Sequence, residues 1–235
     1  YFFEIAYKGT DFHGWQKQPN ALSIQEVVED KFTTYMKEDV NITGSGRTDT
    51  GVHCEQQYFH CDLDREFTKS DLFKLNSFIP DSILLRNFWL VSDEKHARFD
   101  ATLRKYHYCI LRERNPFLLD TSYHFHRPLD LDSMKKASRL LIGEKDFQCF
   151  SKVKTEVHTF ICDLTEAEWI ESKGTLTFII SGNRFLRGMV RAIVGTLLEI
   201  GEGKRTIEEF IALMDSSDRR QAGAAAPAKG LTLKE

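Results

Sequence analysis

The segment GSGRTDTGVH, residues 44–53, places one carboxylate and one guanidinium in a glycine-rich loop that leads directly into a predicted strand. Glycines take backbone conformations that other residues avoid, and they let a ligand approach the backbone closely. Asp49 and Arg47 are two residues apart and can meet across a tight turn. An aspartate between two threonines is also a common turn former that hydrogen-bonds its own backbone. The loop is therefore a candidate for chemistry, with a plain turn as the alternative.

Regular elements are predicted on both sides of this loop. Apolar residues alternate from Phe3 to Tyr7, which indicates a strand. Ser23, with Glu26 three residues on, has the pattern of a capping box, and apolar residues then recur at helical spacing to Met36. Residues 52–63 predict a strand, so the loop lies in a strand–helix–loop–strand unit. We further predict a helix over 68–78, a strand over 83–91, and a strand over 104–112 in which Tyr106, Tyr108 and Ile110 share one face.

The second half repeats this mixture of helices and strands. A broad apolar stripe from Phe185 to Leu198 predicts the longest helix of the chain, packed deep against a sheet. Arg184, Arg187 and Arg191 fall at intervals of three and four, so we expect them along one edge of that helix, where at least one meets a carboxylate or a phosphate. The other predicted elements are a helix over 132–142, strands over 159–170 and 175–181 with a turn at Lys173 and Gly174, a helix over 206–214, a linker over 215–230 and a last short strand.

The composition is that of a globular intracellular protein. With 235 residues, 41% of them hydrophobic and 29% charged, the chain can bury one or two sizeable cores. No apolar run approaches the roughly 20 residues that a membrane span needs, and the first residues lack a secretion-signal pattern. The five cysteines are odd in number and form no C-x-x-C pair, which argues against a disulfide framework or a zinc ribbon. We therefore expect a cytoplasmic protein without membrane contact.

Charge limits the ways in which the chain can bind nucleic acid. A formal net charge of −3 argues against indiscriminate coating of nucleic acid, since such binding neutralises many phosphates at once. Basic residues nevertheless gather within 98–114 and within 184–191, so a local basic surface can exist on a weakly acidic molecule. Ordinary solvated faces are the alternative explanation.

No pattern for a cofactor or a metal is present in the sequence. The glycines of residues 44–51 have the wrong spacing for G-x-G-x-x-G and lack G-K-[ST], which argues against dinucleotide and ATP loops. The histidines of residues 124–126 and the His–Cys pairs at 53–54 and 60–61 have no common zinc spacing. We expect neither a cofactor nor a metal.

Five spaced blocks of the chain match the signature of a known family. Residues 46–53 fit G-R-T-D-x-G-V-H-A letter by letter, with Cys54 where alanine is usual. Residues 7–20, followed by 23–25, fit an opening Y-D-G-x-x-F-x-G-W-Q block, except that Lys8 replaces the usual aspartate. Further matches cover residues 99–108, 183–191 and 229–231. Together these blocks resemble the tRNA pseudouridine synthase A family, and five spaced matches are far more specific than any one of them.

The resemblance implies a fold and an activity. The fold is α+β, with two related α/β domains built on antiparallel sheets and a central active-site cleft; we expect domains over 1–95, with the catalytic loop, and over 96–235. The activity is that of an isomerase, an intramolecular transferase that converts uridine to pseudouridine at positions 38, 39 and 40 in the anticodon stem-loop of tRNA. No cofactor is required, and a homodimer that contacts one tRNA is implied.

The resemblance also implies roles for four residues. Asp49 is the essential catalytic aspartate and Arg187 its basic partner. Tyr106 stacks on the target uracil and helps to move a proton, and Arg47 fills the gap left by the flipped nucleotide. A structural ion pair for Arg187 and a plain core position for Tyr106 remain alternatives. Whether the carboxylate attacks C1′, attacks C6 or removes the C2′ proton stays open.

Two other classes of function remain in view. A catalytically inactive RNA-binding module would retain tRNA without forming product. A nucleoside or glycoside hydrolase breaks the same kind of bond but usually employs two carboxylates. The loop supplies only Asp49, although Glu55 or Asp100 could be brought near it by folding.

Overall fold

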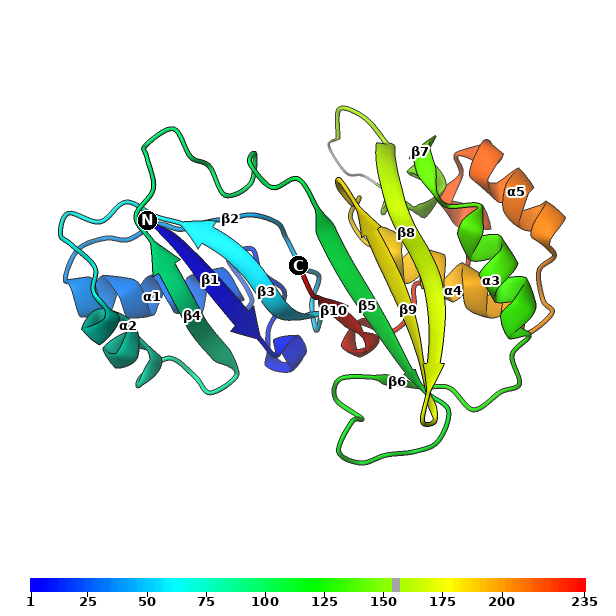
Figure 1. Cartoon of the computed structure of the whole chain (residues 1–235), viewed down its shortest axis with the longest axis horizontal. Coiled ribbons are helices and arrows are strands. Elements are labelled where there is room, and N and C mark those ends of the chain that lie inside the picture. Colours follow the sequence, from blue (N-terminus) through cyan, green and yellow to red (C-terminus); the bar gives the residue numbers. More distant parts are fainter. Residues whose placement is uncertain (154–156) are drawn as a thin grey trace. The chain divides into compact units, whose positions relative to one another are not determined.

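The computed structural model describes residues 1–153 and 157–235. The chain divides into two compact units. Unit 1 contains Tyr1–Thr102 together with Leu233–Glu235, and unit 2 contains Leu103–Thr232. Each unit combines antiparallel strands with helices (Figure 1), so the predicted α+β class with antiparallel sheets is confirmed. Among the described residues, no helix has the length and apolar character needed to cross a membrane.

Unit 1 is built on a sheet centred on its first strand. Its elements are β1 (Phe2–Tyr7), a short 3-10 turn over Gly9–Asp11, α1 (Ile24–Met36), β2 (Thr43–Gly44), β3 (His53–His60), α2 (Lys69–Asn76) and β4 (Ile83–Trp89). β1 pairs antiparallel with both β3 and β4, and β2 pairs with β3. Phe3 points inward from β1. Its ring centroid lies 5.0 Å from that of Phe32 on α1 and 5.1 Å from that of Phe59 on β3. The alternating apolar residues that the sequence predicts in β1 are thus buried in the core of unit 1, where α1 lies against the sheet (Figure 1).

The helices of unit 1 begin where their capping residues lie. Ser23 Oγ accepts a hydrogen bond from the Glu26 amide at 3.2 Å and starts α1. Thr68 and Asp71 form a full capping box at the start of α2, because each side chain accepts the backbone N–H of the other residue.

Unit 2 contains the remaining elements, which are β5 (Arg104–Leu111), β6 (Tyr123–His124), α3 (Leu131–Arg139), β7 (Gly143–Asp146), β8 (Ile161–Ser172), β9 (Thr175–Gly182), α4 (Met189–Gly201), α5 (Ile207–Ser216), three short 3-10 turns (Gln148–Phe150, Arg219–Gln221 and Ala228–Gly230) and the start of β10 (Leu231–Leu233). β5, β9, β8 and β7 pair antiparallel in that order, and β6 lies parallel to β5. Trp169 of β8 donates to Ser138 Oγ of α3 at 2.9 Å, which joins a helix to the sheet through a buried hydrogen bond.

The predicted hairpin between β8 and β9 is confirmed. Lys173 and Gly174 both have positive φ, 44° and 78°, as a two-residue hairpin loop of the type I′ class requires. Gly174 takes its angle without a Cβ penalty, whereas Lys173 holds a left-handed conformation that lysine rarely adopts.

Two predictions for unit 2 were wrong at helix boundaries. The apolar stripe predicted a helix from Phe185, but α4 begins at Met189, because Gly188 with φ 72° breaks the run at its N-cap. α4 has 13 residues, the same number as α1, and is therefore not longer. The helix predicted over 132–142 ends at Arg139, and the chain then turns into β7.

The late start of α4 also corrects the expected arginine edge. Arg184 and Arg187 precede the helix, and of the three arginines only Arg191 lies on it. Arg187 is exposed, so its side chain needs no buried counter-ion in unit 2.

Candidate active site

The loop that carries Asp49 is tied to the sheet of unit 1 through the residue before it. The Thr48 hydroxyl lies 2.8 Å from the Tyr7 hydroxyl, which also donates to Gln57 Oε1 at 3.2 Å. Gln57 Nε2 in turn donates to the Gly46 carbonyl at 3.0 Å. Tyr7 is on β1 and Gln57 on β3, so two central strands hold both sides of the loop.

Asp49 begins a tight turn at the end of the loop. The Val52 amide donates to the Asp49 carbonyl at 3.1 Å, and Gly51 has φ 77°, as the third residue of a type II turn requires. The Gly51 amide donates to Phe12 O at 3.2 Å. The Asp49 side chain is half-buried, whereas Arg47 is exposed. The turn thus fixes the backbone of Asp49, a residue that is only partly buried.

The first sequence block packs directly on this loop. The Trp15 amide donates to the Thr48 carbonyl at 3.2 Å. Gly14 has φ 83°, and a Cβ there would lie 2.3 Å from the same carbonyl oxygen. A Cβ on Gly9 would lie 2.0 Å from Val52 O, and one on Gly44 would meet the Trp15 ring at 2.5 Å. The block at 7–20 and the Asp49 loop are therefore one packing unit.

Cys54, where the family signature has alanine, follows the loop at the start of β3. Its side chain is 2% exposed, and its Sγ lies 3.9 Å from the Ile5 carbonyl. Burial raises the pKa of the Cys54 thiol, so it stays neutral. A neutral thiol fills this buried position on β3 without introducing a charge.

Tyr106 lies on β5 of unit 2. It pairs with Ile180 of β9, is 9% exposed, and meets the Phe185 ring edge-on with centroids 5.2 Å apart. Phe185 is in the short segment between β9 and α4. Tyr106 is therefore held between a strand and the segment that carries Arg187.

Arg187 sits in a turn that precedes α4. The Met189 amide donates to Leu186 O at 3.1 Å, and the Lys152 amide donates to the Arg187 carbonyl at 2.9 Å. The backbone of Arg187 is thus fixed while its side chain is exposed. One turn on, Arg191 Nε donates to Ala226 O at 2.8 Å, and the Ala226 amide donates back to Arg191 O at 2.9 Å.

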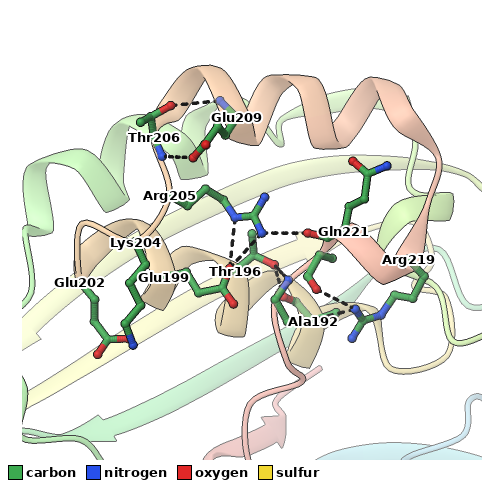
Figure 2. Close-up of polar contacts among 12 residues, drawn as sticks. Ala192, Thr196, Glu199, Glu202, Lys204, Arg205, Thr206, Glu209, Arg219 and Gln221 are labelled. Carbon is green, nitrogen blue, oxygen red and sulfur yellow. Dashed lines mark hydrogen bonds and ion pairs between the residues drawn. The ribbon is translucent and has the colours of Figure 1, made fainter.

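A strap over residues 218–226 crosses α4 (Figure 2). The Gly223 amide donates to Thr196 Oγ1 at 2.9 Å, and a Cβ on Gly195 would lie 1.8 Å from the Ala224 carbonyl. At its other end, Arg205 donates to Glu199 Oε2 at 3.0 Å and to the Gln221 carbonyl at 2.8 Å. The absence of a side chain at Gly195 therefore lets the backbone at Ala224 lie directly on α4.

The strap leads into the last sequence block. The Tyr108 hydroxyl donates to the Pro227 carbonyl at 2.8 Å, and a Cβ on Gly230 would lie 2.6 Å from the Tyr108 ring. Burial raises the pKa of Tyr108, which keeps this donor protonated. The block at 229–231 thus packs on the same strand that carries Tyr106.

The four predicted site residues fall into two pairs. Asp49 and Arg47 share one loop of unit 1, and Tyr106 and Arg187 belong to unit 2. The prediction did not identify Tyr7 and Gln57, which hold the loop. Tyr7 is the first residue of the block at 7–20, so the motif match could have identified it. Gln57 lies in no matched block and resembles any other polar strand residue. No group of three His, Cys, Asp or Glu side chains suited to a metal ion is found within residues 1–153 and 157–235.

Comparisons with known proteins agree with the sequence blocks. A family model described as tRNA pseudouridine synthase matches residues 137–235. The tRNA pseudouridine synthase A of Bacteroides fragilis is 43% identical over 236 residues, which cover 99% of this chain and 94% of that protein. Its namesake from Porphyromonas gingivalis is 41% identical over 100% of this chain and 95% of its own length. The corresponding protein of Brevibacillus brevis is 40% identical, over 98% and 96%.

These matches place the chain among the pseudouridine synthases, which are isomerases. Since relatives of 40% identity and more align over almost their whole length, the chain belongs to the tRNA pseudouridine synthase A family. A solved Cbf5–Nop10–Gar1 complex is similar at a TM-score of 0.40 and 10% identity, over 98% of this chain and 57% of that one, which is too distant to inform the site.

Proposed function

We propose that this enzyme converts uridine to pseudouridine at positions 38, 39 and 40 in the anticodon stem-loop of tRNA, with Asp49 as its essential catalytic residue. The proposal depends on an alignment with a tRNA pseudouridine synthase A that covers 99% of this chain at 43% identity. It is supported by the position of Asp49 on a turn, which the contact between Tyr7 and Thr48 holds against the sheet. A loop fixed in this way holds a carboxylate at a defined position before the substrate binds.

The reaction balances without any co-reactant. The bond from ribose C1′ to uracil N1 breaks, the base turns, and C5 joins C1′. C5 then loses its proton and N1 carries one, so the product is an isomer of the substrate. Asp49 acts in its ionised form, as a nucleophile at C1′ or C6 or as the base that removes the C2′ proton.

Arg187 is proposed as the basic partner of Asp49. A guanidinium beside a carboxylate favours the ionised form that the reaction needs. In unit 2 the backbone of Arg187 is fixed by Lys152 and its side chain is exposed, which supports a role toward something outside that unit's core. A structural role inside the core of unit 2 has no such support.

Tyr106 and Arg47 are proposed to handle the target nucleotide. The edge-on contact with Phe185 orients the Tyr106 ring, which suits stacking on uracil. Arg47 is exposed on the same loop as Asp49, which suits a side chain that replaces a nucleotide flipped out of its stack. Other arginines and lysines would hold the RNA backbone by shape and phosphate position.

The remaining parts of the proposal come from the family. We infer a cytoplasmic homodimer in which both subunits contact one tRNA. Size-exclusion chromatography with light scattering, with and without tRNA, tests this part independently of catalysis. A monomer in both conditions would contradict it.

The hydrolase alternative gains no support from the two other carboxylates. Glu55 is paired with Lys234, and Asp100 accepts the His96 amide at 3.1 Å and lies 4.0 Å from Lys95. Both carboxylates are therefore already engaged. Release of free uracil from uridine would nevertheless favour a hydrolase over the proposed isomerase.

Pseudouridine-specific chemical labelling of treated tRNA tests the proposal. We expect labelled products at the three anticodon stem-loop positions with the wild-type enzyme, and none above background with Asp49→Asn. Retained tRNA binding by Asp49→Asn would separate catalysis from recognition. Undiminished labelling by this variant would contradict the essential role of Asp49.

A further inference from the structure

One side chain of α1, that of Gln25, bonds to two segments. One contains Gln16 and Lys17, which follow the residues packed on the Asp49 loop, and the other contains Ile42, which precedes that loop. Gln25 Oε1 accepts hydrogen bonds from Gln16 Nε2 at 2.7 Å and from the Lys17 amide at 3.1 Å. Gln25 Nε2 donates to Glu29 Oε1 at 2.9 Å and to the Ile42 carbonyl at 3.0 Å. A side-chain amide offers two donor hydrogens and two acceptor positions, and here all four are used.

Glu29 completes the same network one helical turn later. Its Oε1 accepts the Ile42 amide at 3.2 Å, and its Oε2 lies 3.0 Å from Lys17 Nζ. Glu29 is 6% exposed, so this ion pair and these hydrogen bonds compensate for a buried charge. The hydrogen bond to Glu29 and the charge of its carboxylate raise the pKa of Lys17.

Both backbone groups of Ile42 are thus bound by side chains of one helix. Ile42 is 3% exposed and immediately precedes β2, where the glycine-rich loop begins. A buried backbone needs partners for its N–H and its C=O, and here Gln25 and Glu29 supply what a neighbouring strand would otherwise supply. The entry to the Asp49 loop is therefore set by α1.

The start of α1 holds the other flank. The Ile24 amide donates to Gly14 O at 3.1 Å, and the Gln25 amide donates to Trp15 O at 3.0 Å. Gly14 and Trp15 are the residues that contact the Thr48 carbonyl. Gln25 therefore bonds to two segments that border the loop. Its backbone amide binds Trp15, which packs on the loop, and its side chain binds Ile42, which precedes the loop in the sequence.

We propose that Gln25, supported by Glu29, is a positioning residue for catalysis, which sets the place of Asp49 by fixing both flanks of its loop. It touches neither the substrate nor the reacting atoms in this role. The proposal rests on Asp49 being the catalytic residue. A shift of about 1 Å in a catalytic group costs up to roughly 100-fold in rate, so a loosened loop lowers turnover more than binding.

Gln25→Met is the direct test, because methionine keeps the length of the side chain and removes all four hydrogen bonds. We expect kcat on tRNA to fall about tenfold, while the Kd for tRNA stays within about twofold. Hydrogen exchange at the amides of residues 48–52 should become faster. Gln18→Ala is the matched control, since it removes one exposed hydrogen bond to His13 O from the same segment and leaves Ile42 untouched.

Gln25→Glu provides a second variant that fails for a different reason. It keeps the acceptor for the Lys17 amide, loses both donor bonds and places a second carboxylate beside Glu29. We expect kcat to fall at least as far as in Gln25→Met and loop exchange to be at least as fast, because a carboxylate oxygen would then face both Glu29 Oε1 and the Ile42 carbonyl. If either variant does not fold, the folded one of the two decides the question, and hydrogen exchange at residues 48–52 is read from that variant.

The outcomes separate this inference from the proposed function. Wild-type kcat in a folded Gln25 variant, or a loss of tRNA affinity equal to the loss of kcat, would overturn the positioning role. So would unchanged loop exchange. A wild-type enzyme that forms no pseudouridine would instead defeat the proposed function, and the exchange experiment would still test whether Gln25 orders the loop.

Discussion

The hydroxyl of Tyr7 lies 2.8 Å from the hydroxyl of Thr48, 41 residues further along the chain. Tyr7 is 4% exposed at the end of β1, and Thr48 is the residue before Asp49. This contact connects β1, which lies between β3 and β4 in the sheet, to the loop that carries the proposed catalytic carboxylate. The position of Asp49 is therefore a property of the sheet as much as of the loop.

Tyr7→Phe should lower kcat about fivefold and destabilise the protein by roughly 1 kcal/mol, because it removes the hydroxyl that Thr48 and Gln57 share. Single-turnover kinetics on tRNA and thermal unfolding measure the two effects. Tyr1→Phe is the matched control, because the Tyr1 hydroxyl accepts the Phe67 amide at 3.1 Å in another part of unit 1. Equal loss of kcat in both variants would mean that stability alone explains the effect.

Gly14→Ala should inactivate the enzyme. The new Cβ would lie 2.3 Å from the Thr48 carbonyl, and the backbone there has φ 83°. Either the loop moves or the variant loses several kcal/mol of stability. Gly203→Ala is the control, since φ is 71° and nothing lies within 4 Å, so it should cost only about 1 kcal/mol and leave kcat unchanged. Circular dichroism melts and the labelling assay check both, and full activity in Gly14→Ala would contradict the close packing.

The sequence predicted the elements that local patterns determine. The strand through Phe3, the capped start of α1 at Ser23 and the hairpin at Lys173 and Gly174 all follow from short-range rules of alternation, capping and turn chemistry. The start of α4 did not, because the apolar stripe continues through Phe185 and Leu186. One glycine with positive φ, Gly188, decides that boundary.

The network around the candidate site depends on contacts between distant residues. Nothing local in the sequence says that Gln25 binds the backbone of Ile42, or that Gln57 on β3 reaches Gly46. Such contacts depend on which strands pair and which helix packs beside them. The motif identified the candidate residues, whereas the structure identifies what holds the Asp49 loop in place.

Arg187→Leu should lower kcat by about 100-fold while tRNA binding is retained, because a charge that favours ionised Asp49 would be lost. Since Arg187 is exposed, its replacement should change stability by less than about 0.5 kcal/mol. Arg139→Leu makes the same chemical change at an exposed position at the end of α3 and should leave kcat unaltered. Single-turnover rates with saturating enzyme measure the difference. Full turnover by Arg187→Leu would remove this residue from the active site.

The stability of unit 1 should fall at acid pH through Asp71. The Arg65 guanidinium, 2.9 Å away, and hydrogen bonds from Thr68 and from Tyr35 at 2.6 Å hold the pKa of Asp71 well below its ordinary value. A lowered folded-state pKa means that the stabilisation is complete above the unfolded value of about 3.9 and is lost as pH falls toward the folded value.

Asp71→Asn should therefore destabilise the protein by roughly 2 kcal/mol at pH 7, because it removes a charged acceptor from these partners. Below about pH 4 the difference between the variant and the wild type should shrink, since the wild-type carboxylate is then protonated in the unfolded chain. Urea unfolding at pH 7, 5, 4 and 3 measures the trend. A difference that stays constant from pH 7 to 3 would show that the carboxylate's charge is not what stabilises the start of α2.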